Sequence, residues 1–309
     1  MYDVNKYFLI DKSIVKDNDT FIFDIYGKNS FEDELIQVYE KAQTLTEKLS
    51  KTILSYKYLY VENTHRDIYD EYYKNSKHQT IIPKNTQKFY EDIALKIDKL
   101  FENPERIENL EQTKEIVSNM VSIVLEESFT ISSFISILEY EYYNHTHSLN
   151  VCVYSLCLGK QLNLTKPSLE ELGISAILHD IGKTKIDQSI INKDGKLNEV
   201  EFKEVMKHPF YGTLLAKKLG INNIKILEGI KYHHEKMDGT GYPDGLFETQ
   251  IPLYAKIIGT CDIFDALTTK KTYQDSVSTF DTLIMMKKEM SKQLDSKIIN
   301  AFIEIFRNK

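Results

Sequence analysis

Two short stretches of the sequence are the most informative, HDIGK at residues 179–183 and YHHEKMDGTGYP at residues 232–243. The whole chain contains eight histidines, and six of them fall between residues 145 and 234. Neutral imidazole and carboxylate groups are the common protein ligands of borderline divalent metals. Together with Asp180 and Asp262, these histidines predict a site for a pair of metal ions, and such a site is typical of a hydrolase.

The helical spacing around the first histidines indicates which of them face inward. Residues 132–160 have the pattern of a helix on which His147 shares an apolar stripe with Val151 and Tyr154. His145 points away from this stripe and is expected at the surface. A single inward histidine is more often a core residue than a ligand, so His147 taken alone leaves both alternatives open.

A second helix is expected to begin at a capping box formed by Ser168 and Glu171 and to carry His179 on its buried stripe. Asp180 follows at the end of this helix. Burying an unpaired carboxylate is costly, so Asp180 needs either a metal cation or a neighbouring loop that it caps. The residues alone leave these two alternatives open. Further along, Asn198 with Glu201 predicts the cap of another helix.

A helix over residues 253–269 places Asp262 and Asp265 on one face. Asp262 is a candidate metal ligand, and Asp265 is a candidate partner that holds a ligand in place. Adjacent histidines point in different directions on regular backbone, so His233 and His234 are expected to serve different positions of a two-metal site. The glycine-rich stretch that follows them, residues 238–245, predicts an irregular loop.

Composition limits the class of protein. A chain of 309 residues is long enough for two domains, and 42% hydrophobic and 28% charged residues describe an ordinary soluble protein. The formal net charge of −7 argues against a partner that is a nucleic acid polymer. Three cysteines without a CxxC pair favour a reducing, cytoplasmic setting. We expect no secretory signal and no membrane span, because no apolar run approaches the roughly 18 residues that a span requires.

The first part of the chain has a different pattern from the rest. Residues 21–26 and 56–61 are rich in aromatic and β-branched residues and predict strands, and residues 31–52 between them have helical spacing. Residues 1–65 are therefore expected to form a small α+β module with a regulatory role. Residues 66–129 predict a charged helical connector.

The motifs taken together resemble those of the HD-GYP domain, a branch of the HD phosphohydrolase superfamily. The resemblance rests on HDIGK, on HHExxDGxGYP at residues 233–243 and on DIFDALTT at residues 262–269, which occur in the order and approximate spacing of the family. It covers roughly residues 130–309. The fold class that follows is mainly α, with an all-helical HD-GYP catalytic domain at residues 130–309 after the small α+β module and the helical connector.

The resemblance also implies an activity and a set of site residues. HD-GYP domains hydrolyse cyclic di-GMP, a bacterial second messenger, to linear pGpG or onward to GMP, at a centre of two or three metals that are often iron or manganese. By motif position, Asp180 would bridge two metals and Lys183 would lie near the scissile phosphate. Gly241, Tyr242 and Pro243 would form the rim of the site and contact substrate or a partner such as a GGDEF-type signalling protein. The metal ligands implied in this way are His147, His179, Asp180, His208, His233, His234 and Asp262.

The chemistry of these residue types agrees with that activity. A pair of cations lowers the pKa of a bound water and holds a phosphate oxygen. Five imidazoles and two carboxylates suit octahedral iron or manganese better than a closed tetrahedral zinc site.

The chain departs from the family at three positions. Tyr143 stands where members with a third metal carry Glu, so two divalent metals are expected. Lys271 stands where the family usually has Arg, with Gln274 after it, and Lys271 remains a candidate for substrate binding. Two alternatives to the cyclic di-GMP phosphodiesterase are a catalytically weak receptor for cyclic di-GMP and a phosphodiesterase for another cyclic dinucleotide.

Overall fold

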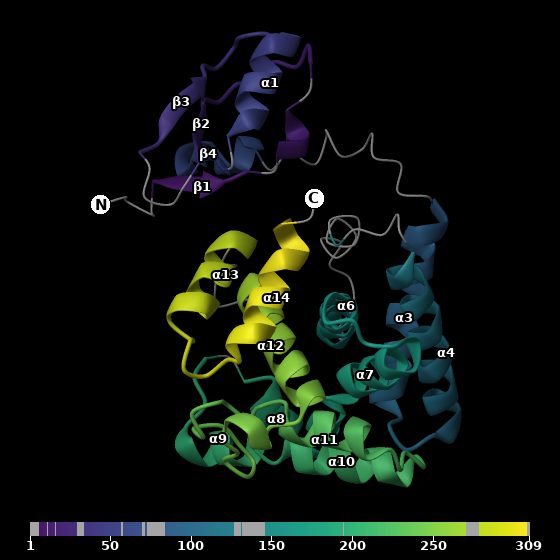
Figure 1. Cartoon of the computed structure of the whole chain (residues 1–309). Helices are drawn as coiled ribbons and strands as arrows, with labels where there is room; N and C mark the ends of the chain where they lie inside the picture. The colour runs from purple at the N-terminus through teal and green to yellow at the C-terminus, as the bar shows by residue number, and fades with distance from the viewer. Residues whose placement is uncertain are drawn as a thin grey trace. The chain divides into compact units, whose positions relative to one another are not determined.

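The structure is a computed structural model that describes most of the chain. The described residues are 6–10, 12–15, 17–29, 34–56, 58–69, 72, 84–126, 131, 146–193, 195–269 and 278–307. The chain divides into two compact units, Met1–Ile82 and Pro83–Lys309 (Figure 1). The finer division expected from the sequence, with boundaries near residues 65 and 129, stays a prediction.

The first unit is an α+β module, as predicted. Its four-stranded antiparallel sheet has the order β1-β4-β2-β3. Its elements are β1 (Tyr7–Leu9), the 3₁₀ helix η1 (Lys12–Ile14), β2 (Ile25–Lys28), β3 (Ile36–Tyr39), α1 (Glu47–Ser55), β4 (Tyr58–Glu62) and η2 (Asn63–His65). An aromatic core that includes Phe21, Phe23 and Tyr39 lies under the sheet, and all three side chains are buried.

The prediction of a helix over residues 31–52 was wrong for residues 34–46. Residues 36–39 form β3 instead, and they pair with β2. Val38 and Tyr39 favour an extended backbone, and the ladder to β2 outweighs the helical spacing of their neighbours. The helix begins only after Thr46, whose hydroxyl accepts a hydrogen bond of 3.3 Å from the N–H of Leu49.

The helices and loops described in the second unit include no β-strand beyond one isolated bridge between Asp238 and Phe247, which confirms the predicted fold class. The longer helices are α3 (Lys84–Glu102), α4 (Ile107–Leu125), α6 (Thr146–Gln161), α7 (Lys166–Leu178), α10 (His208–Lys218), α12 (Leu253–Thr268), α13 (Thr279–Lys288) and α14 (Ser296–Arg307). The shorter ones are η3 (Ile181–Lys185), α8 (Gln188–Ile191), α9 (Glu199–Val205), α11 (Ile224–Tyr232) and η4 (Glu248–Gln250).

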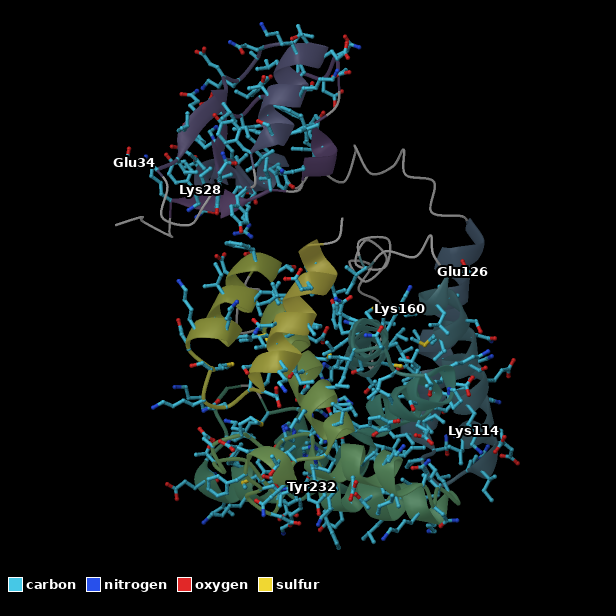
Figure 2. The ribbon with its side chains drawn as sticks, viewed as in Figure 1. Lys28, Glu34, Lys114, Glu126, Lys160 and Tyr232 are labelled. Atoms are coloured by element: carbon cyan, nitrogen blue, oxygen red, sulfur yellow. The ribbon has the colours of Figure 1, made fainter. Side chains whose placement is uncertain are left out.

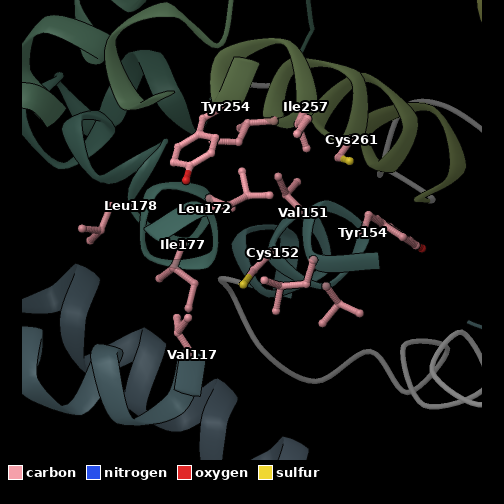
Figure 3. Close-up of a cluster of buried hydrophobic side chains, with 14 of the residues drawn as sticks. Val117, Val151, Cys152, Tyr154, Leu172, Ile177, Leu178, Tyr254, Ile257 and Cys261 are labelled. Carbon is pink, nitrogen blue, oxygen red and sulfur yellow. The ribbon is translucent and has the colours of Figure 1, made fainter. Parts of the chain in front are cut away.

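Helix α6 is the centre of this unit. Every residue from 148 to 159 is buried, and a helix that is apolar on all sides must lie inside a core. It packs against α7 and α12, and Figure 3 shows Val151 and Cys152 of α6 among Leu172 of α7 and Ile257 of α12. The end of α6 is tied to α4, because the ammonium group of Lys160 donates 2.6 Å and 3.3 Å hydrogen bonds to the carbonyl oxygens of Val124 and Glu126 (Figure 2).

Helix α7 begins earlier than predicted, with its N-cap three residues before the predicted cap. Its N-cap is Thr165, whose hydroxyl accepts from the N–H of Ser168, so Ser168 is not the cap. The reason is Pro167, which lacks an N–H and fits the first turn of a helix without loss. The prediction at α9 was confirmed: Asn198 and Glu201 form a capping box with hydrogen bonds of 2.9 Å and 2.8 Å. Among the described residues, no helix is long and apolar enough to cross a membrane.

Candidate metal centre

Three buried imidazoles are held by the same kind of hydrogen bond. The Nδ1 atoms of His179, His208 and His233 lie 2.7, 2.8 and 2.8 Å from the carbonyl oxygens of the residues three positions earlier in the chain. A carbonyl oxygen can only accept, so in each ring Nδ1 carries the proton. In the neutral ring the Nε2 atom is then left with a free lone pair, which is the form that binds a metal.

The free Nε2 atoms converge on Asp180. The Asp180 Oδ1 atom lies 3.2 Å from Nε2 of His208 and 3.9 Å from Nε2 of His233, and Oδ2 lies 3.5 Å from Nε2 of His179. The Nε2 atoms of His208 and His233 are only 3.3 Å apart. Lone pairs and a carboxylate facing one another at these distances repel unless a cation lies between them.

Two of these atoms lack hydrogen-bond partners. Asp180 Oδ1 and His179 Nε2 are fully buried and make no hydrogen bond in the part of the chain that the structure describes. A buried polar atom without a partner is costly, and a metal ion would satisfy both. The donor set therefore fits the metals that the sequence implied.

His147 enters the same site from α6 and is oriented by a carboxylate. Its Nδ1 atom lies 2.7 Å from Oδ2 of Asp265, whose other oxygen accepts a 2.8 Å hydrogen bond from the side chain of Asn150. Its Nε2 atom lies 3.1 Å from Oδ1 of Asp262 and 3.7 Å from Oδ2 of Asp180. Asp265 thus contacts a predicted ligand, as expected. Asn150 was missed, although its place three residues after His147 on one helix face could have identified it.

The predicted ligands form two groups that share Asp180. In one group, ligand atoms of Asp180, His208, His233 and His234 lie within 4.8 Å of one another, and in the other those of His147, His179 and Asp180 do. Asp262 lies beside both, since its Oδ2 atom is 3.8 Å from Nδ1 of His234 and its Oδ1 atom is near His147. The structure therefore brings all seven predicted ligands together.

The electrostatics keep the carboxylates charged. Burial raises the pKa of the Asp180 carboxyl, but the charge of the adjacent Lys183 outweighs burial and holds this pKa well below its ordinary value. The pKa of Asp262 is also lowered: burial opposes this, and the hydrogen bond with His147 and the charge on that ring prevail. The Nζ atom of Lys183 lies 2.5 Å from Oδ2 of Asp180, and its side chain is 35% exposed.

The imidazoles differ in protonation. Burial lowers the pKa of His234 to about 3 and that of His233 well below its ordinary value, so both rings are neutral at neutral pH. For His147, burial also lowers the pKa, but the hydrogen bonds to Asp262 and Asp265 outweigh it and raise the pKa to about 10. In the metal-free protein the charge on His147 thus balances these carboxylates in part.

Gly182 of HDIGK allows the close packing of two segments of the site. A Cβ atom at this position would lie 1.9 Å from the carbonyl oxygen of His208 and 2.4 Å from the backbone nitrogen of Gly212. Only glycine permits this approach of η3 to the start of α10. The contact brings His208 to Asp180.

The loop of the GYP motif packs directly on the candidate ligand His234. The ring of Tyr242 stacks on the His234 imidazole with 4.6 Å between centroids, and the Tyr242 N–H donates to the His234 carbonyl at 3.2 Å. Gly241 lies against the backbone of residues 234–236, where a side chain would clash, and the Tyr242–Pro243 peptide bond is cis. Pro243 is exposed.

Glu235 organises this loop and was missed by the sequence reasoning. Its buried carboxylate accepts three backbone hydrogen bonds, of 2.7, 3.0 and 2.9 Å, from the N–H groups of Asp244, Gly245 and Leu246. A Glu beside two histidines carries no sequence signal for that role. Lys271 and Gln274 lie outside the described residues, as do Tyr143 and His145.

Proteins with similar sequences are cyclic dinucleotide phosphodiesterases by name. The cyclic di-GMP phosphodiesterase PA4108 of Pseudomonas aeruginosa is 32% identical over 190 residues, which cover 62% of this chain and 46% of that protein. The 3'3'-cGAMP-specific phosphodiesterase 3 of Vibrio cholerae is 31% identical over 216 residues, covering 66% of this chain and 46% of that protein. The chain thus spans about half the length of these relatives.

A solved structure shares the fold over almost the whole chain. It is that of Bd1817 of Bdellovibrio bacteriovorus, described as an HDG"Y"P protein. It superposes with a TM-score of 0.60 at 18% identity and covers 98% of this chain and 100% of that one. In addition, the family described as "HD domain" matches residues 132–298, more than half of the sequence and every candidate ligand. The chain therefore belongs to the HD domain family, in its HD-GYP branch.

Proposed function

We propose that this chain is a metal-dependent phosphodiesterase that hydrolyses cyclic di-GMP to pGpG, with GMP as the candidate end product. The observation that carries the proposal is the sharing of Asp180 by two groups of potential ligands. A carboxylate with one oxygen toward each group is what a pair of adjacent cations requires. The names of the related proteins support the substrate class.

We propose two divalent metals, iron or manganese, as cofactors. His147, His179, Asp180 and Asp262 would hold one, and Asp180, His208, His233 and His234 would hold the other. When bound, such a pair supplies a hydroxide nucleophile at neutral pH and neutralises charge on the phosphate. Hard oxygen donors mixed with imidazole favour these metals over a thiolate-selective ion.

The residues of the chain prepare the site for that chemistry. Asp265 and the backbone carbonyls orient four of the five imidazole rings, so less rotamer entropy is lost when metals bind. The side chain of Lys183 is partly exposed beside Asp180, and we assign it to the scissile phosphate. Gly241, Tyr242 and Pro243 form the rim, and we propose that this rim contacts the substrate or a GGDEF-type or other signalling protein.

We assign residues 1–65 to a regulatory module, 66–129 to a connector and 130–309 to catalysis, in a cytoplasmic protein. The N-terminal module contributes none of the candidate ligands.

A second candidate substrate is the mixed dinucleotide 3'3'-cGAMP, because a relative is named as specific for it. Turnover of cyclic di-GMP and of 3'3'-cGAMP by the metal-loaded protein separates the two, since the preferred substrate has the higher kcat/KM. Binding of cyclic di-GMP without turnover would identify the receptor alternative instead.

The test of the metal centre is Asp180→Ala. We expect it to abolish turnover and to reduce bound metal, with the helical content of wild type. His145→Ala is the control, because its expected helical face points away from the site. Turnover and metal content of Asp180→Ala at the wild-type level would overturn the assignment of the shared carboxylate.

A further inference from the structure

A row of aromatic rings extends from the candidate ligand His234 through Tyr242 to Phe202. Tyr242 stacks on His234, and its ring centroid lies 6.4 Å from that of His208 and 6.4 Å from that of Phe202. The Phe202 ring is nearly perpendicular to Tyr242, with 82° between the planes. Phe202 is 49% exposed, so one part of it contacts the site and the rest faces solvent.

Phe202 is held firmly in this position. It belongs to the first turn of α9, and its N–H donates a 2.9 Å hydrogen bond to the carbonyl of Asn198. The preceding residue, Glu201, closes the capping box and also accepts 2.7 Å hydrogen bonds from Lys193. These contacts hold the backbone from which the Phe202 ring projects, and a flat apolar side chain on a fixed backbone is partly organised in advance for a flat ligand.

We propose that Phe202, with Tyr242 behind it, is the surface on which a purine base of the substrate stacks. This inference rests on the proposed function, because it takes the phosphate of the cyclic dinucleotide to lie at the metal centre. Every nucleobase has an apolar face that stacks on aromatic side chains. The Tyr242 ring centroid lies 4.6 Å from that of the candidate ligand His234 and 6.4 Å from that of Phe202, so Phe202 is separated from the candidate ligands by one aromatic ring.

The experiment compares Phe202→Ala and Phe202→Trp with wild type on two substrates. Cyclic di-GMP has purine bases, whereas methyl 4-nitrophenyl phosphate is a phosphodiester without them. For Phe202→Ala we expect KM and Kd for cyclic di-GMP to rise by about fivefold to a hundredfold, the range typical of losing one base–aromatic stack. We expect kcat, bound metal and turnover of the small diester to stay within about twofold of wild type, and Phe202→Trp to restore the affinity.

Phe210 offers a matched control. It is 50% exposed and lies on the neighbouring α10, where its ring contacts Tyr211 and not Tyr242. Phe210→Ala should keep the wild-type affinity. An unchanged Kd for Phe202→Ala, or an equal loss for Phe210→Ala, would overturn the proposal.

Direct binding, measured by titration calorimetry, distinguishes this inference from the proposed function. Wild type that binds cyclic di-GMP without hydrolysing it would sink the phosphodiesterase function, and the comparison of Kd values would still decide the role of Phe202. Wild type that neither binds nor hydrolyses cyclic di-GMP would overturn both.

Discussion

Substitution of Gly182 by alanine tests whether close packing of the backbone sets the spacing of the metal ligands. The new Cβ atom would lie 1.9 Å from the carbonyl oxygen of His208, and real Cβ contacts essentially never fall under 3.0 Å. The two segments must therefore separate by about 1.1 Å to bring that contact from 1.9 Å to 3.0 Å. Metal–ligand distances tolerate only about 0.2 Å, so we expect Gly182→Ala to lose most of its bound metal.

The same displacement lowers stability. Forcing extra volume into a packed contact costs about 1–3 kcal/mol, which corresponds to a Tm roughly 2–12 °C lower in a domain of this size. Thermal unfolding with and without Mn²⁺ measures both effects, because a metal that binds only the folded state raises Tm. We expect Mn²⁺ to raise the Tm of wild type and to leave that of Gly182→Ala nearly unchanged.

Gly212→Ala is the matched control on the other side of this contact. Its Cβ atom would meet a methyl group of Ile230 at 3.1 Å and the backbone nitrogen of Gly182 at 3.4 Å, so a small side-chain shift accommodates it. Metal content in Gly182→Ala equal to that of wild type, with the same Tm increase, would refute the role of this packing in ligand spacing.

Three further predictions concern the metals, the substrate and pH. Elemental analysis of the saturated protein should approach two metals per chain, and a third ordered metal near Tyr143 would contradict this. Lys271→Ala should raise KM several-fold at low salt and less at moderate salt, because a lysine contributes mainly by charge. KM values of the variant that match those of wild type at both salt concentrations would exclude the role. In metal-free protein, His147 has its pKa raised to about 10, above the ordinary value of 6.5, so the folded state binds the extra proton between these values. Urea unfolding in EDTA should therefore show stability falling as the pH rises from about 6.5 to 10, and His147→Gln should reduce this slope.

The family motifs in the sequence were sufficient to predict which seven side chains the structure brings together, and their role as metal ligands stays a prediction. His179, Asp180, His233 and His234 lie in contiguous motifs, and Asp262 follows at a fixed distance along a helix. These motifs can be recognised without knowledge of the fold, because their order along the chain predicts that they form a common site. The distances were not predictable, because they depend on contacts such as that of Gly182 with His208, which are 26 residues apart in the chain.

Residues that support the site through hydrogen bonds were harder to find. Asp265 was identified from its helix face, but the three hydrogen bonds of Glu235 depend on the path of the loop after Tyr242. The sequence also led to one wrong assignment in the N-terminal module. Strand β3 was assigned to a helix because its pairing partner, β2, lies about ten residues earlier and pairing leaves no periodic signal in a four-residue strand.

The ends of three helices explain why the imidazoles of this site are both ordered and receptive to cations. The carbonyl oxygens of Ala176, Val205 and Ile230, which accept from the three histidine Nδ1 atoms, belong to the last turns of α7, α9 and α11. Carbonyls in a last turn lack partners within their own helix. Each histidine therefore satisfies a helix end and is oriented by it in the same contact. These ends also carry partial negative charge, which favours a nearby cation. The three histidines at these ends all lie near Asp180, so the partial negative charge of the helix ends adds to that of the two carboxylates and helps to stabilise a bound cation.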